Sequence, residues 1–167
     1  MFARFFTILC GLCLIAVAIF GLVANIMFDR NCEGYLKRAA DSNTIGLAEK
    51  NLEKALQYIE AEEMTTGYSS VLWRTPDQDV GFWYENLKAS LAELKRVDPN
   101  ASQLEQSNVL MKLRETLLDE GQSVSVTSPS HIAIFPSQRL VIFGGVIMLI
   151  CTIFGGLMWA SEDNRRW

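Results

Sequence analysis

The apolar residues of this chain gather in two long runs, one near each end. Residues 5–28 carry no charged side chain, and the few positions with any polarity are Thr7, Cys10, Cys13 and Asn25. The second run covers residues 140–160. The hydrocarbon core of a bilayer is about 30 Å thick, and a helix needs roughly 20 apolar residues to cross it. Each run therefore predicts a transmembrane helix, which makes the lipid bilayer a partner of the protein.

The first run is expected to remain in the mature protein as an anchor. Its apolar core is longer than the roughly 7–15 apolar residues of a cleaved signal peptide. The sequence Val23-Ala24-Asn25 at its end also offers no clean cleavage site between small residues.

Flanking charges indicate the orientation of the two helices. Arg4 and the amino terminus precede the first run, and Arg165-Arg166 follow the second, which favours the cytoplasm for both ends. Lysines and arginines on the domain side favour the opposite orientation, but the first helix usually dominates. We expect an integral protein of the bacterial inner (plasma) membrane, with residues 1–4 and 161–167 in the cytoplasm and residues 29–139 outside.

The region between the two runs shows the three-four spacing of amphipathic helices. The first stripe after a short helical piece at residues 34–40 consists of Ile45, Ala48, Leu52, Ala55 and Ile59. A second helix is expected to start at Thr75-Pro76, with Gln78 completing a capping box, and to end near Pro99. A third is expected between Ser102, which forms a capping box with Glu105, and Gly121.

The spacing of the apolar residues then changes to strict alternation. Residues 123–127 alternate between Ser or Thr and Val, turn residues follow, and residues 131–135 alternate less cleanly. This pattern favours a small β-hairpin beside the membrane. The sequence thus predicts a mostly α membrane protein in which two transmembrane helices flank a small extracytoplasmic three-helix bundle with a juxtamembrane β-hairpin.

The charge of the central region narrows the choice of partners. Residues 29–139 hold 17 acidic and 12 basic side chains, a net charge of about −5. A surface with this charge is repelled by phosphate backbones, so nucleic acid is excluded as a partner.

An aromatic group is the most distinctive feature of the central region, and it consists of Tyr68, Trp73, Phe82, Trp83 and Tyr84. Three successive rings on one helix cover more than half of its circumference, so a single buried face cannot hold all three. Either the connection at residues 68–74 folds back over the helix, or one ring is exposed for a partner or a small ligand.

The second apolar run contains small residues, with Thr152, Gly156 and Ala160 at four-residue spacing and Gly145 before them. Such a face lets helix backbones approach closely. The two predicted transmembrane helices pack on each other through it, or it receives a helix of a partner protein. Both interpretations remain open at this point.

Residues that would carry catalysis, a cofactor or a metal ion are not found in any recognised motif. Cys10 and Cys13 have the spacing of a redox pair but lie in an apolar helix, where ordinary packing is expected. His131 is the only histidine, and no nucleophile motif or glycine-rich phosphate loop accompanies it. We therefore expect a protein that is not an enzyme and has no cofactor and no metal site.

The expected function is that of an accessory, assembly or scaffold subunit of a membrane complex, with a membrane protein or further copies of the chain as partners. The alternative is a sensor-like ligand-binding module that signals through a partner. In layout alone, the anchor, outer bundle and second membrane helix are similar to the sensory half of bacterial chemoreceptors. Only residues 161–167 follow the second run, so no signalling domain fits there.

Overall fold

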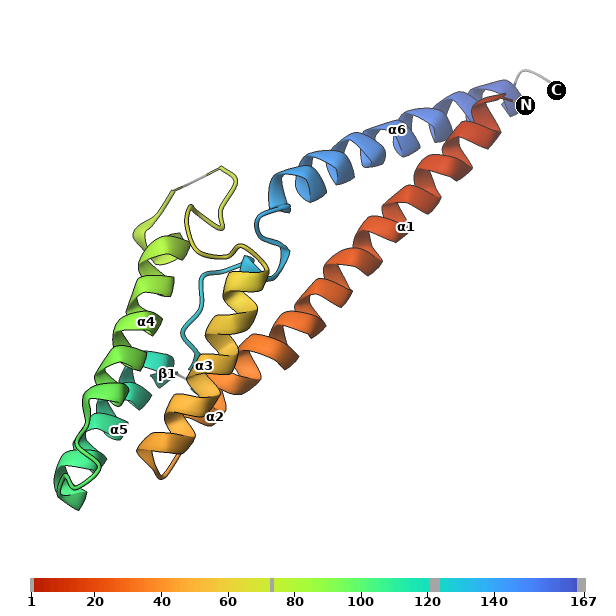
Figure 1. The fold of residues 1–167 in the computed structure, drawn as a ribbon. Helices are drawn as coiled ribbons and strands as arrows, with labels where there is room; N and C mark the ends of the chain where they lie inside the picture. Colours follow the sequence, from red (N-terminus) through yellow and green to blue (C-terminus); the bar gives the residue numbers. More distant parts are fainter. Residues whose placement is uncertain (1, 73, 121–123, 165–167) are drawn as a thin grey trace.

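The fold is built around two long apolar helices. The computed structural model describes residues 2–72, 74–120 and 124–164. Helices α1 (Phe2–Phe28) and α6 (Gln138–Asn164) pack against each other in opposite directions. The start of α1 and the end of α6 therefore lie at the same end of the molecule, and the rest of the chain lies at the other end (Figure 1).

Both helices are long and apolar enough to cross a membrane, over Arg4–Ala40 and Gln138–Ser161. Only 6% of the most apolar stretch of each is buried within the protein. A helix in the core of a soluble protein would be mostly buried. These two helices instead present their apolar side chains outward, as the sequence predicted for helices that face lipid.

The first apolar helix continues beyond the end of its apolar run. It passes without a break into a π-helical turn, η1 (Asp29–Glu33), and then into α2 (Gly34–Ala40). The N–H of Gly34 donates to the carbonyl of Asp29, which is the five-residue step of a π-helix. A Cβ atom at residue 34 would lie 3.1 Å from that carbonyl oxygen, so glycine suits this tight turn. The predicted short helix is thus the last part of one continuous helical segment.

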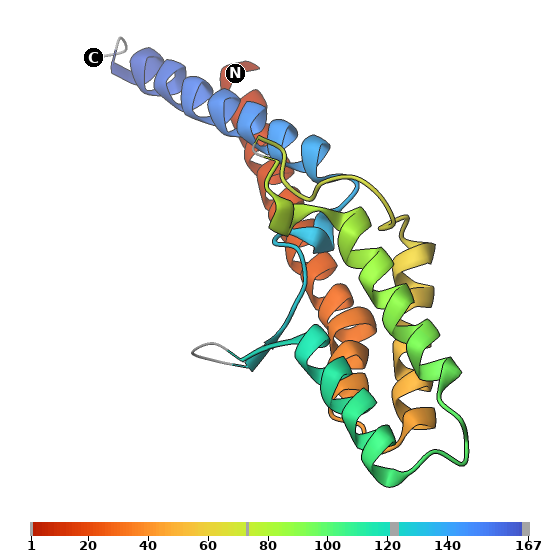
Figure 2. The same ribbon diagram turned by 90° about the vertical axis from the view of Figure 1, so that its left-hand side faces the viewer.

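The three helices predicted for the central region are present as α3 (Ile45–Ala61), α4 (Val80–Arg96) and α5 (Gln103–Leu117). However, α2 packs against both α3 and α5, and α4 packs against α3 (Figure 2). The expected three-helix bundle is therefore a four-helix bundle. The reason is that α2 has its own apolar face, formed by Leu36, Ala39 and Ala40, which the neighbouring helices bury.

The core forms where the predicted apolar stripes meet. The buried residues of α3 and α4 include Ala48, Leu52, Ala55, Ile59, Val80, Leu87 and Leu94. Phe28 and Cys32 extend this core towards α1, and Cys32 has no exposed surface. Because its thiol is fully enclosed, Cys32 is not available to pair with another chain in this conformation.

The start of α4 differs from the prediction. Thr75 makes no capping hydrogen bond, and Pro76–Gln78 forms a short 3₁₀ turn, η2. Asp79 is the N-cap instead, because its Oδ1 accepts a hydrogen bond from the N–H of Phe82 at 3.0 Å. Backbone pairing from Ser69 N–H to the Gln78 carbonyl, at 3.0 Å, holds the chain extended there and delays the helix. At α5 the prediction is confirmed, since Ser102 Oγ accepts from the N–H of Glu105.

A β-hairpin exists, and its strand β2 (Val124–Val126) lies within the predicted first strand at residues 123–127, but its partner strand precedes it instead of following it. Strands β1 (Leu118–Glu120) and β2 are antiparallel, with Leu118 opposite Val126. They follow α5 and lie away from α6 (Figure 2). The predicted second strand contains the 3₁₀ turn η3 (Ile132–Ile134) instead, because Ile132 is buried and this turn packs on α1. Helix α5 ends at Leu117, and the predicted stop at Gly121 lies outside the described residues.

Candidate functional site

A groove of about 350 Å³ lies between the first turns of α4 and the segment that follows β2. One wall comes from η2 and α4, including Asp77, Asp79, Phe82 and Trp83. The other wall is formed by residues 125–130 with Asp119. The groove therefore exists only because the chain after α5 turns back across α4.

Trp83 holds the two walls of this groove together. Its side chain is 7% exposed, and the indole Nε1–H donates to the carbonyl of Thr127 at 2.7 Å. A buried indole N–H needs such a partner, and the bond joins α4 to a segment 44 residues later in the chain. Trp83 thus positions the wall and has little exposed surface in the groove.

Phe82 points in a different direction and is 65% exposed. Consecutive helical residues are about 100° apart, so Trp83 and Tyr84 face the core while Phe82 faces solvent. A large exposed aromatic side chain beside a groove is the kind of residue that protein interfaces enrich. Among the described residues, Phe82 is therefore the strongest candidate for contact with a partner.

The charges around this groove are of one sign. Asp77, Asp79 and Asp119 line it, and its lining among the described residues includes neither Lys nor Arg. Asp79 uses one carboxylate oxygen as the cap of α4, whereas Asp77 and Asp119 are exposed. The local field therefore favours a cationic group over an anionic one.

Tyr84 lies on the α3 side of α4, away from this groove. Its hydroxyl donates to Glu60 Oε1 at 2.7 Å, and Lys88 Nζ lies 5.0 Å from the centre of its ring. The hydrogen bond with Glu60, followed by burial, raises the pKa of Tyr84 to about 12. The phenol is therefore protonated at neutral pH and fastens α4 to α3.

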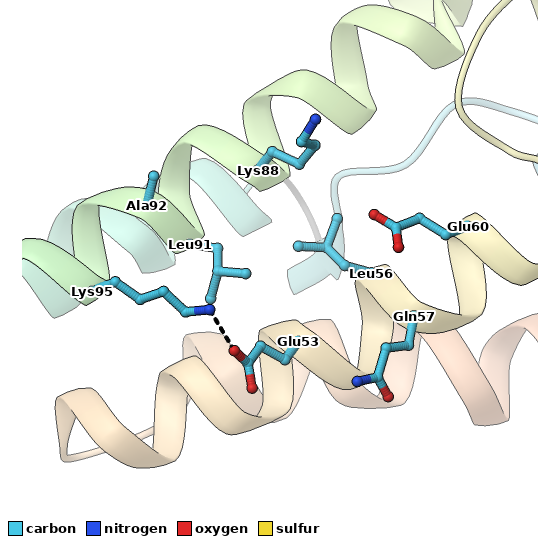
Figure 3. Close-up of a pocket in the computed structure, with 8 residues that line it drawn as sticks. All are labelled: Glu53, Leu56, Gln57, Glu60, Lys88, Leu91, Ala92 and Lys95. Carbon is cyan, nitrogen blue, oxygen red and sulfur yellow. Dashed lines mark ion pairs between the residues drawn. The ribbon is translucent and has the colours of Figure 1, made fainter.

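A second groove, of about 410 Å³, follows the outer surface of α3 and α4 (Figure 3). Its charged side chains are of both signs, and Lys95 Nζ reaches Glu53 Oε1 at 2.6 Å across it. The hydrogen bond with Glu53 raises the pKa of Lys95. Both of its lysines are already paired with carboxylates of the same protein, Lys88 with Glu85 and Lys95 with Glu53. This groove therefore has less to offer a partner than the groove beside Phe82.

The five aromatic residues predicted as one group are divided by the structure. Phe82 and Trp83 line the first groove, and Tyr84 contacts α3. Tyr68 is half-buried in the loop between α3 and α4, where its backbone pairs with Asp79 and Arg74 lies over its ring at 5.6 Å. Trp73 lies outside the described residues. Asp119 and Thr127 were missed from the sequence, since only tertiary contacts bring them to α4.

The small residues that were predicted for helix packing do not all contact α1. A Cβ atom at Gly145 would lie 3.8 Å from Val17 Cγ1, so this glycine meets α1. The Thr152 hydroxyl donates to the Met148 carbonyl within α6, whereas a Cβ atom at Gly156 would meet open space and Ala160 is exposed.

The two apolar helices also approach each other closely at a glycine that the sequence did not single out. Gly155 is buried against the side chain of Thr7, and a Cβ atom there would overlap Thr7 Oγ1. One turn away, the side chains of Cys10 and Cys151 lie next to each other. Arg4 lies over the Trp159 ring at 5.2 Å near the ends of both helices. The signal missed in the sequence is Gly155, the first glycine of the pair Gly155-Gly156, of which only Gly156 was considered.

Within the described residues, no group of three or more His, Cys, Asp or Glu side chains is arranged to hold a metal ion. Comparison of the chain with family models, with curated proteins and with solved structures finds no match.

Proposed function

We propose that this chain is a membrane-anchored, non-enzymatic accessory or assembly subunit that contacts its partner through the groove beside Phe82. In this proposal α1 and α6 cross the membrane, both termini lie in the cytoplasm and the four-helix bundle lies outside. The observation that carries the proposal is the exposed Phe82 side chain next to a groove bordered by three aspartates. A partner segment with one apolar side chain and neighbouring Lys or Arg residues would match this surface in both respects.

A sensor-like ligand-binding module remains the second candidate. The groove volume of about 350 Å³ falls at the lower end of the range of small-molecule sites, roughly 300–1,000 Å³. Tyr84 is not among the described residues that line this groove with Trp83, however, and three aspartate side chains border it. This arrangement favours the protein-binding interpretation over a pocket for an apolar ligand.

The proposal is tested by purifying the full chain in mild detergent and identifying bound proteins by native mass spectrometry. Phe82→Ala is compared with Leu104→Ala, because Leu104 is similarly exposed at 72% but lies on α5. A stoichiometric membrane partner is expected with the wild type and with Leu104→Ala. Loss of a central aromatic contact costs about 2 kcal/mol or more, so Phe82→Ala should weaken binding at least about tenfold.

Salt provides an independent test of the charge match. Binding should weaken as the salt concentration rises, and Asp77→Asn together with Asp119→Asn should reduce that dependence. Recovery of the chain only as a monomer or as a homo-oligomer would contradict the hetero-complex. Saturable binding of a small molecule that Phe82→Ala abolishes would support the sensor instead.

A further inference from the structure

The loop between α3 and α4 is attached to the segment that leads into α6. Gln138, in the first turn of α6, is 3% exposed, and its Nε2 donates to the carbonyl of Tyr68 at 3.1 Å. A Cβ atom at Gly67, whose φ of 103° suits glycine, would lie 3.4 Å from Phe135 Cζ. The loop is thus held at two points next to the place where α6 begins, as Figure 1 also shows.

The base of this loop is closed by backbone pairing. The N–H of Ser69 donates to Gln78 at 3.0 Å, and the N–H of Val80 donates to Gly67 at 2.9 Å. This pairing fixes the base of the loop beside the start of α6, and the described residues between Ser69 and Gln78 extend from that base.

An apolar side chain is exposed on the part of the loop that extends outward. Leu72 is 76% exposed, which is close to the 80% of Leu140 in the first turn of α6. Leu140 begins an apolar stretch suited to lipid. By contrast, Leu104 is 72% exposed but belongs to α5, which lies far from α6 (Figure 1). Arg74 lies over the Tyr68 ring nearby, and a long cationic side chain of this kind can reach the phosphate layer.

We propose that the tip of this loop enters the headgroup region of the bilayer, with Leu72 in contact with lipid. The inference rests on the proposed membrane crossing of α6, since Gln138 and Tyr68 then place the loop at the membrane surface. Such a contact gives the bundle a third attachment to the membrane besides α1 and α6, and it restricts how the bundle tilts. The groove at Phe82 would then be held in one orientation relative to the membrane.

The test uses three variants, Leu72→Cys, Leu140→Cys and Leu104→Cys, each labelled with a bimane maleimide and placed one copy per phosphatidylcholine nanodisc. The wild type is the labelling blank, because Cys10 and Cys32 are buried and Cys13 and Cys151 lie within the apolar helices. Quenching is measured with lipids that carry a doxyl group near the headgroup. The probe at residue 72 is expected to be quenched about threefold or more strongly than that at residue 104, because the interface lies within contact of shallow lipid groups.

The probes at the three positions distinguish a failure of this inference from a failure of the proposed membrane placement. If the probe at residue 140 is quenched but those at residues 72 and 104 are equally unaffected, the loop does not touch lipid and only this inference is overturned. If the probe at residue 140 is not quenched, α6 does not cross the bilayer and the proposed membrane placement fails as well. Protection of residue 72 from aqueous iodide without doxyl quenching would show a protein cover and would also overturn the inference.

Discussion

At the scale of single residues, neighbouring side chains of the same chemical kind take different roles. Phe82, Trp83 and Tyr84 are three aromatic residues in a row, yet one is exposed, one bonds to Thr127 and one bonds to Glu60. The helical rotation of about 100° per residue separates them. Their hydrogen-bonding ability then determines which neighbour each buried ring finds.

The pKa of Tyr84 provides a prediction at this scale. Replacing Glu60 with Gln should lower the pKa of Tyr84 from about 12 towards its ordinary value of 10, because the carboxylate that stabilises the protonated phenol is removed. The contribution to stability is complete below pH 10 and is lost as the pH rises through about 12. The measurement is a titration of tyrosinate absorbance, with Tyr84→Phe identifying the signal. Glu105→Gln on α5 is the control, and an equal shift in that variant would contradict the assignment.

The N-cap of α4 provides a second prediction. Asp79→Ala removes the acceptor of the Phe82 N–H and should destabilise the protein by about 1 kcal/mol. Thr75→Ala should change stability little, because Thr75 makes no capping bond. Thermal unfolding in detergent, followed by circular dichroism, compares the two variants. If Thr75→Ala lowers the stability more than Asp79→Ala does, Thr75 is the N-cap, as the sequence predicted.

At the scale of elements, the pairing of α1 with α6 includes a close approach at one of two adjacent glycines. Gly155 lies against Thr7, whereas the adjacent Gly156 has open space where a side chain would project. The two glycines are therefore distinguishable by experiment although they are neighbours in the sequence.

Gly155→Leu should separate the two helices, because the added side chain meets Thr7, and overpacking of this kind costs about 1–3 kcal/mol. Gly156→Leu should leave the pair intact. The readouts are thermal stability and the yield of a Cys10–Cys151 disulfide formed with a lipid-permeant oxidant in a chain carrying Cys13→Ala and Cys32→Ala. Equal effects of both substitutions would contradict the packing. Loss of a bound partner in Gly156→Leu alone would instead indicate that this side of α6 receives another helix.

At the scale of the whole molecule, one continuous helical segment joins the two regions. Because α1, η1 and α2 follow one another without a loop, the apolar helix is joined directly to the bundle core, to which Phe28 and Leu36 belong. The π-helical turn at Asp29–Glu33 is the point where the helix geometry changes, and such turns often mark functional positions.

Orientation is predicted at this scale too. Since α1 and α6 are antiparallel, both termini must lie on one side if both helices cross the membrane. In intact cells, Leu104→Cys should react with an impermeant maleimide, whereas an epitope tag at the carboxyl terminus should be detected only after permeabilisation. The reverse pattern would place the bundle in the cytoplasm, and wild-type protein controls for labelling of the native cysteines.

The sequence by itself determined the elements whose cause is local. The two apolar runs, the stripes of α3, α4 and α5 and the Ser102 cap were readable because helical periodicity and capping depend on residues within a few positions. Only the tertiary structure decided what depends on distant partners. The pairing of Ser69 with Gln78 moved the start of α4, burial of Ile132 against the core replaced a predicted strand, and the bond from Trp83 to Thr127 built the groove. These contacts join residues far apart in the chain, and local periodicity carries no information about such contacts.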